Sequence, residues 1–163
     1  MQRYEVSWTI EANHGGGYQY RIAPADGPLT EESFGKIPLP FVGKQSLRWG
    51  GGSANGGSEI SFDGTYVSED TVPKGSAWVV NPIPRNDWTG QHGVASGFKP
   101  HCNDTKMCQG MTDGSSAIPD LEIVDQVMIP LGTPPGSYVL GWRWDCEESN
   151  QIWQSCSDIT ITA

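Results

Sequence analysis

Apolar and polar side chains alternate strictly near the start of the chain. Apolar residues occupy the even positions from 4 to 12, and polar residues occupy the odd positions between them. A period of two predicts a strand with one buried face. Three glycines at positions 15–17 interrupt the pattern, and Tyr18, Tyr20 and Ile22 then begin a second run. These two runs predict a hairpin-like pair of strands.

Similar patterns continue along the chain. We expect a strand to begin near Ser58, a short strand over residues 77–81, and longer strands in the runs DLEIVDQVMIPL, PPGSYVLGWRWDC and CSDITITA. In the second of these runs Tyr138, Leu140, Trp142 and Trp144 share one face, which predicts that both tryptophans belong to the core. The run LTEESF predicts one helical turn, capped by Thr30. Residues 50–57 and 84–119 have no sustained period and are expected to be loops.

Seven or so strands with turn signals between them predict an all-β fold. The specific expectation is an immunoglobulin/fibronectin-III-like β-sandwich with long loops, formed by residues 1–163 as a single domain. The 21 glycines and 12 prolines of the 163-residue chain agree with this, because they favour short strands and turns over a helical bundle.

Charge and hydropathy exclude some partners. The net charge of −9 argues against nucleic acid, since phosphate binding needs a basic face. No segment approaches the ~20 apolar residues of a membrane span. We therefore expect neither a nucleic-acid nor a membrane partner, and a monomer that acts on an uncharged ligand.

The four cysteines form two couples that are close in sequence. The spacing predicts the disulfides Cys102–Cys108 and Cys146–Cys156, and there is no Cys-x-x-Cys motif of a zinc or thioredoxin-like site. Disulfides persist in oxidising compartments, so the chain is expected to be secreted.

Two segments carry a resemblance to a known family: WTIEANHGGGYQYRI and GSYVLGWRWDCEESNQIWQSCSDITI. They resemble the lytic polysaccharide monooxygenases and the related chitin-binding type 4 domains. In that family an Asn-His-Gly turn after a strand supplies a copper-binding histidine. A run of the form Gln-x-aromatic-x-x-Cys-Ala/Ser-Asp-Ile follows near the C-terminus, and residues 151–159 match it here. The resemblance covers most of residues 4–23 and 120–162.

The resemblance implies a role for three residues. His14 corresponds to the second copper histidine, Gln151 to the residue that hydrogen-bonds an oxygen species at the metal, and Trp153 to the aromatic residue that shields an axial position. The implied function is copper-dependent oxidative cleavage of a polysaccharide of the chitin or cellulose type by a secreted domain.

The chain also departs from the family pattern. It begins Met-Gln, so the family's N-terminal segment, with its first copper histidine, is expected to be absent. Ala23 and Ser33 stand where the family has a cysteine pair. His92 or His101 would have to supply a second nitrogen for copper, because a single histidine makes a poor site for this metal.

Two other interpretations remain open. The chain could be a non-catalytic carbohydrate-binding module that contacts glycan through Tyr18, Trp49 and Trp88. It could also be a structural or engineered scaffold without a ligand. His14 would then be an ordinary turn histidine, and the acidic residues at 145, 147 and 148 are expected to form a solvated loop rather than a general acid/base pair.

Overall fold

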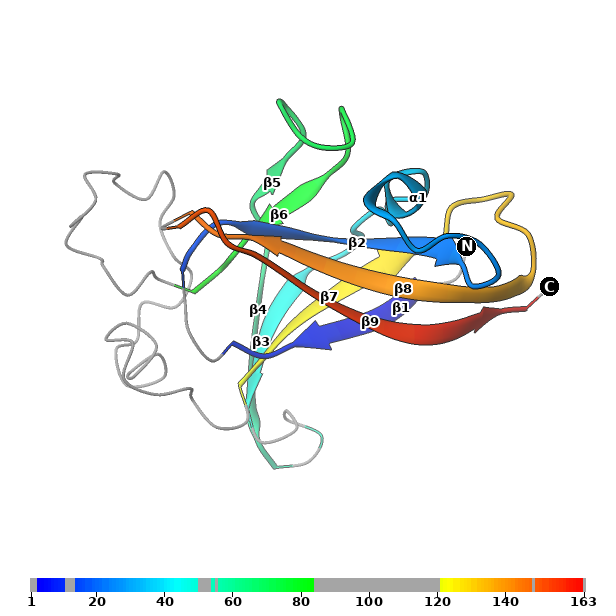
Figure 1. Ribbon diagram of the computed structural model, residues 1–163. Helices are drawn as coiled ribbons and strands as arrows, with labels where there is room; N and C mark the ends of the chain where they lie inside the picture. The colour runs from blue at the N-terminus through cyan, green and yellow to red at the C-terminus, as the bar shows by residue number, and fades with distance from the viewer. Residues whose placement is uncertain are drawn as a thin grey trace.

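The chain folds into two antiparallel sheets that pack face to face (Figure 1). The computed structural model describes residues 3–10, 14–49, 54, 56–83, 121–147 and 149–162. The four-stranded sheet has the order β1 (Arg3–Trp8), β7 (Glu122–Met128), β3 (Gln45–Trp49) and β4 (Ser58–Phe62). The five-stranded sheet has the order β5 (Tyr66–Val67), β6 (Trp78–Val80), β2 (Gly17–Pro24), β8 (Gly136–Asp145) and β9 (Ile152–Ile161). The predicted all-β sandwich is confirmed.

Most of the predicted elements are present. The helical turn is α1 (Glu31–Gly35), and the Thr30 side chain accepts a hydrogen bond from the backbone N–H of Ser33, as the cap prediction requires. The last strand begins at Ile152, four residues before its predicted start. The strands β3 and β5 were not predicted. No helix in the described ranges is long and apolar enough to cross a membrane.

The predicted hairpin between the first two runs is wrong. β1 pairs with β7 in one sheet, whereas β2 pairs with β6 and β8 in the other. Alternation of side chains shows that a strand has a buried face, but it does not select the neighbour with which the strand exchanges hydrogen bonds.

The core between the sheets is rich in aromatic rings. The ring of Trp8 on β1 lies 4.9 Å from Tyr18, 4.7 Å from Trp142 and 5.5 Å from Trp144, measured between ring centroids. These contacts join the end of β1 to the start of β2 and the end of β8, and so they fix how the two sheets are aligned.

A buried polar group lies in this core. The Tyr18 hydroxyl donates to the Asp125 carboxylate at 2.8 Å, and the Gln45 amide donates to both Tyr18 and Asp125. Asp125 is 1% exposed, and its burial raises its pKa to about 6, although the two hydrogen bonds oppose the rise.

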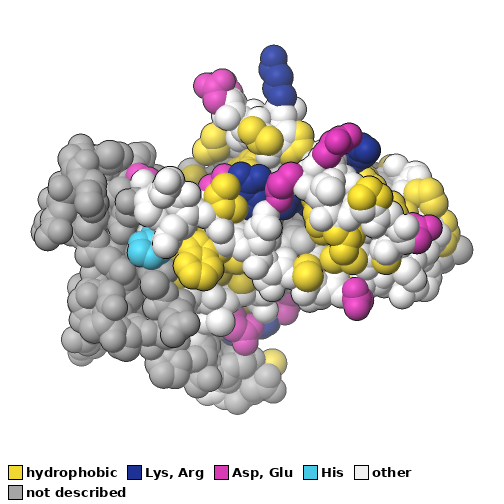
Figure 2. Space-filling model, in the orientation of Figure 1, with side chains coloured by type: hydrophobic (Ala, Val, Ile, Leu, Met, Phe, Trp, Pro, Cys, Tyr) yellow, Lys and Arg dark blue, Asp and Glu magenta, His cyan; other side chains and the backbone are white. Residues whose placement is uncertain are grey.

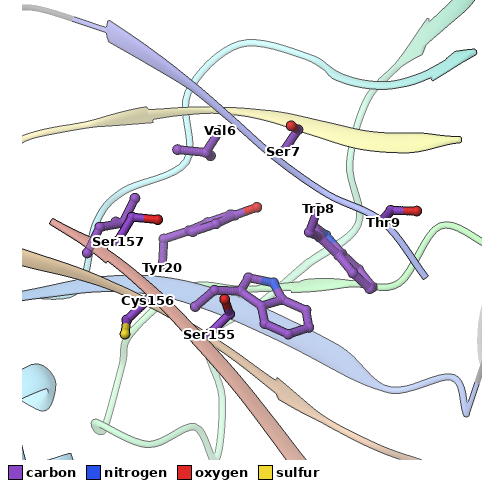
Figure 3. Close-up of a pocket in the computed structure, with 10 residues that line it drawn as sticks. Val6, Ser7, Trp8, Thr9, Tyr20, Ser155, Cys156 and Ser157 are labelled. Atoms are coloured by element: carbon purple, nitrogen blue, oxygen red, sulfur yellow. The ribbon is translucent and has the colours of Figure 1, made fainter. Parts of the chain in front are cut away.

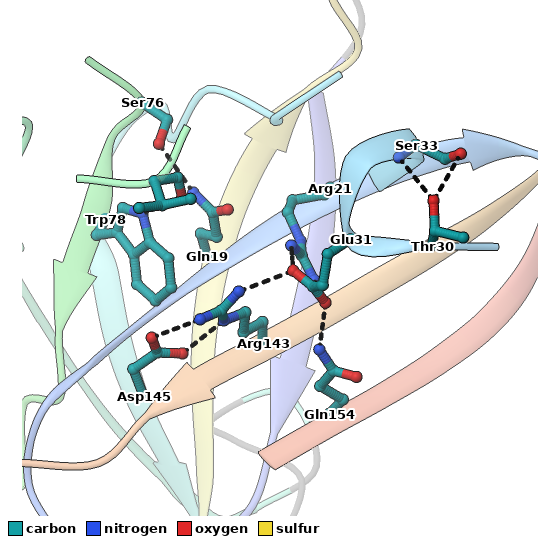
Figure 4. Close-up of polar contacts among 11 residues, drawn as sticks. Gln19, Arg21, Thr30, Glu31, Ser33, Ser76, Trp78, Arg143, Asp145 and Gln154 are labelled. Carbon is teal, nitrogen blue, oxygen red and sulfur yellow. Dashed lines mark hydrogen bonds and ion pairs between the residues drawn. The ribbon is translucent and has the colours of Figure 1, made fainter. Parts of the chain in front are cut away.

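The outer face of the five-stranded sheet carries a network of charges that holds α1 in place (Figure 4). The Glu31 carboxylate accepts hydrogen bonds from Arg21 at 2.6 Å, from Arg143 at 2.7 Å and from the Gln154 amide. The Arg21 hydrogen bond is the main reason why the pKa of Glu31 is lowered to about 2. Arg143 also donates two hydrogen bonds to Asp145, at 2.6 and 2.8 Å.

The predicted Cys146–Cys156 disulfide is wrong. Cys156 pairs with Gly141 in the β8–β9 register, whereas Cys146 follows the last residue of β8. Five residues of strand separate the two positions by roughly 16 Å, at about 3.3 Å per residue. A disulfide needs Cα atoms within about 7 Å. The predicted Cys102–Cys108 pair lies outside the described residues.

Candidate functional site

One end of the sandwich collects most of the residues predicted to be functional. β1 and β3 finish there beside the start of β7, and β8 finishes there beside the starts of β2 and β9. We call this region the Trp153 end and define it by His14, Trp49, Gln151, Ile152 and Trp153.

His14 lies just before β2 and is held through its backbone and its ring. Its carbonyl oxygen accepts a hydrogen bond from the Glu147 N–H at 3.0 Å. Its half-buried imidazole stacks on Trp144, with 6.4 Å between centroids and 25° between planes. Figure 2 shows one histidine at the surface beside hydrophobic side chains, and His14 is the only histidine among the described residues.

The glycines after His14 are explained by close backbone packing. Gly16 has a φ of +77°, and a Cβ atom there would lie 2.0 Å from the Asp145 carbonyl oxygen. The Trp144 indole N–H donates to the Gly15 carbonyl at 2.7 Å. These close contacts leave no room for side chains at this turn, so glycine is required there. They also hold His14 against the end of β8.

Gln151 lies just before β9, on the opposite side of the end of β8 from His14. Its carbonyl oxygen accepts from the Cys146 N–H at 3.1 Å, and its side-chain oxygen accepts from the Ser149 hydroxyl at 3.1 Å. Because His14 and Gln151 are bonded to the consecutive residues Glu147 and Cys146, the structure brings the two sequence-predicted residues to the same turn.

Trp153 is the most prominent aromatic residue at this end. It pairs directly with Trp144 in the β8–β9 register, yet it is 49% exposed while Trp144 is 4% exposed. The neighbouring Ile152 is 52% exposed. Two large apolar side chains thus meet solvent at the start of a regular strand.

Sequence reasoning did not single out Ile152, although a signal was present. Counted along β9, the side chains that share its face are Gln154, Cys156, Asp158 and Thr160. When the other side chains on one face of a strand are polar or small, that face is expected to meet solvent. An isoleucine on the same face is then expected to be exposed.

The predicted glycan-binding residues have different outcomes. Tyr18 is fully buried and its hydroxyl is bonded to Asp125, so the prediction that it contacts glycan is wrong. A period-two pattern predicts which side chains share a face, and here that face is the core. Trp49 is half-buried and packs against the core. Trp88 lies outside the described residues.

The acidic residues near this end have structural partners. Asp145 forms the two-bond ion pair with Arg143, and the Glu147 carboxylate lies 3.4 Å from the backbone N–H of Gly16. The prediction of a purely solvated loop is therefore too simple for these two residues, because each helps to hold the turn.

The described residues do not fit a copper ion on their own. Copper(II) prefers a tetragonal set of nitrogen and oxygen donors. No group of three or more His, Cys, Asp or Glu side chains that could hold a metal is found in the part of the chain that the structure describes. His14 supplies one imidazole, and the other two candidates, His92 and His101, lie outside the described residues.

Comparison with known proteins adds no relative: no family model, no curated protein and no solved structure matches the chain.

Proposed function

We propose that this domain binds a neutral polysaccharide of the chitin or cellulose type through the Trp153 end. The observation that carries the proposal is the half-exposed indole of Trp153 on a regular strand, in register with the buried Trp144. An indole face in water is available to stack on the apolar face of a sugar ring, and large exposed apolar groups commonly mark interaction sites.

The surroundings of Trp153 support a neutral ligand. Gln151 and Ser149 place an amide and a hydroxyl group just before the strand, and such groups exchange hydrogen bonds with sugar hydroxyls. The net charge of −9 opposes an anionic polymer by long-range repulsion. Because Trp153 lies on a paired strand, its backbone is held in place before binding, which lowers the entropy cost of association.

The resemblance supplies a second candidate, copper-dependent oxidation of the same polysaccharide. It is favoured by the placement of His14, Gln151 and Trp153 at one end of the sandwich, although these residues do not complete a copper site. A copper titration by calorimetry, on the wild type and on His14→Ala, tests it. Tight binding that depends on His14 supports this candidate, and weak binding that is insensitive to His14 rejects it.

Depletion from solution by insoluble chitin and cellulose tests the binding proposal. We expect Trp153→Ala to weaken binding about tenfold, which corresponds to roughly 1.4 kcal/mol of lost stacking. Trp153→Phe keeps an aromatic ring and should retain part of the affinity. The matched control is Leu131→Ala, which removes another exposed apolar side chain from the turn before β8. Equal binding by the wild type and Trp153→Ala contradicts the proposal.

A further inference from the structure

β9 is the least protected edge strand of the two sheets. The edge strands among the described residues are β1, β4, β5 and β9. β5 is two residues long, β4 five and β1 six, and both β4 and β1 carry charged side chains. β9 is ten residues long, contains no Lys, Arg or Pro, and has a single charged residue, Asp158 (Figure 1). Proteins usually protect sheet edges by shortness, charge or proline, so the free edge of β9 is open to another strand.

The side chains of β9 are complementary to those of a second copy of the same strand. When two copies pair antiparallel about Cys156, Gln154 of each lies opposite Asp158 of the other. The Gln154 amide then donates to the Asp158 carboxylate, and this contact forms twice. On the inner face, Trp153 of each copy lies opposite Ile159 of the other. Hydrogen-bonding pairs and pairs of aromatic with β-branched side chains are among those that stabilise antiparallel strands.

Neighbouring registers of the same pair fit less well. A pair centred on Asp158 places two like charges directly opposite each other, which is destabilising. A pair centred on Ser157 places Asp158 opposite Cys156. A pair centred on Ser155 places Trp153 opposite a serine. The charge and the apolar side chains of β9 therefore select both a second copy as the occupant of this edge and the register about Cys156.

Cys156 lies at the centre of this pair. Its partner on β8 is Gly141, which lies under the Phe34 ring of α1 on the outer face of the sheet. Figure 3 shows the Cys156 side chain pointing away from Tyr20 in the core, and the thiol is free and exposed. Residues directly opposite in an antiparallel pair have Cα atoms about 4.5 or 5.5 Å apart. Both distances lie within the range of a disulfide, about 4.4–6.8 Å, so the two thiols can join without a shift of the strands.

We infer that the free edge of β9 binds a second copy of this chain, which joins two five-stranded sheets into one across a two-fold axis. The ten residues of β9 cover a strip roughly 33 Å long and one strand wide. Such a strip is well below the ~800 Å² that each partner of a standard interface buries. The reduced chain therefore associates weakly, and a disulfide between the two Cys156 residues makes the dimer persistent. Ile159 of the second copy stands beside Trp153 rather than over it, so dimer formation does not depend on glycan binding at the Trp153 end.

The oxidant for this step is a small-molecule disulfide such as oxidised glutathione. The Cys156 thiolate of one copy attacks it, forms a mixed disulfide and releases one small thiol. The Cys156 thiolate of the second copy then attacks the protein sulfur of the mixed disulfide, which forms the bond between the copies and releases the second small thiol. Two protein thiols are oxidised, and one small disulfide is reduced to two thiols.

Cross-linking of the full chain by oxidised glutathione, followed by non-reducing electrophoresis and peptide mapping, tests the register. The matched control is the double variant Cys156→Ser, Thr160→Cys, whose new thiol lies on the same face of β9 at an exposed position. In the inferred pair, the two copies of position 160 are eight residues, roughly 26 Å, apart. We expect the wild-type thiols to join about tenfold faster than those of the control, because pairing raises their effective concentration.

Amide exchange tests whether the two strands form hydrogen bonds with each other. In the oxidised dimer, exchange along β9 should be about tenfold slower than in the Cys156→Ser monomer, because N–H groups on the free edge gain acceptors. Equal cross-linking rates for the wild type and the control overturn the inference. So does a dimer joined through another cysteine, or one in which the amides of β9 exchange as fast as in Cys156→Ser.

Discussion

At the scale of single residues, two carboxylates respond to their surroundings in opposite directions. Burial raises the pKa of Asp125 to about 6, whereas the hydrogen bond from Arg21 lowers the pKa of Glu31 to about 2. Burial disfavours the charged form of Asp125, and the arginines favour the charged form of Glu31. The two residues therefore contribute to pH-dependent stability in different windows.

We expect the free energy of unfolding to fall as pH rises from about 4 to about 6 because of Asp125. In this range the folded protein binds more protons than the unfolded chain, and the two-unit difference corresponds to at most about 3 kcal/mol. Urea unfolding between pH 4.5 and 6.5 measures the slope of the free energy of unfolding against pH. Asp125→Asn should flatten it, while Asp63→Asn, at an exposed position, should keep the wild-type slope. An unchanged slope in Asp125→Asn would show that this carboxyl is not responsible.

Replacement of Glu31 should destabilise the fold, since the Arg21 side chain is only 4% exposed and loses its anionic partner. We expect Glu31→Gln to lower the free energy of unfolding by about 1–3 kcal/mol. The wild type should also lose stability as pH falls from about 4.5 toward 2. In this range Glu31 becomes protonated in the unfolded chain but stays ionised in the folded protein, because its pKa is lowered to about 2. Glu32→Gln is the matched control, because that side chain is 86% exposed. Equal stability of the two variants would contradict the role of Glu31.

At the scale of elements, the sequence predicts strands better than it predicts their partners. Period-two alternation identified β1, β7 and β8, and the Thr30 cap identified α1. Pairing depends on contacts between distant segments, so the hairpin of the first two runs was wrong. β3 was missed because its buried residues include the polar Gln45 and Ser46, whose environment comes from the other strands.

The candidate site was predictable to a similar degree. The resemblance indicated His14, Gln151 and Trp153, and the structure brings them to one end of the sandwich. The polar and small residues on the same face of β9 signalled the exposure of Ile152, but the signal was not used. The burial of Tyr18 could not be fixed by local pattern alone, because it depends on which side of the sheet is covered by the other layer.

The β8–β9 register makes a prediction about the cysteines. Because Cys156 lies opposite Gly141 and is exposed, it should react with a maleimide in the folded protein. Peptide mapping without reduction should contain no peptide that joins Cys146 to Cys156. Cys156→Ser should leave the melting temperature within about 2 °C of the wild type, as for a surface substitution. A Cys146–Cys156 cross-linked peptide would show that the register is shifted.

At the scale of the whole molecule, the proposed function is carried by one end of the sandwich. The Trp153 end exposes an aromatic and an apolar side chain beside an amide and a hydroxyl group. Along the side of the sandwich, the edge strands β1 and β9 leave Ser155 and Ser157 exposed. We assign a neutral polysaccharide to the Trp153 end.

Titration of the seven tryptophan indole N–H signals with chitohexaose and cellohexaose tests the assignment of the Trp153 end most directly. The ring of Trp153 is expected to contact the sugar, so its indole signal should shift in a saturable manner with at least one of the two oligosaccharides. The signal of Trp142, whose indole N–H is buried, should stay in place. A titration in which the Trp153 signal does not move up to millimolar oligosaccharide, or in which only the Trp142 signal moves, would contradict glycan binding at this end of the molecule.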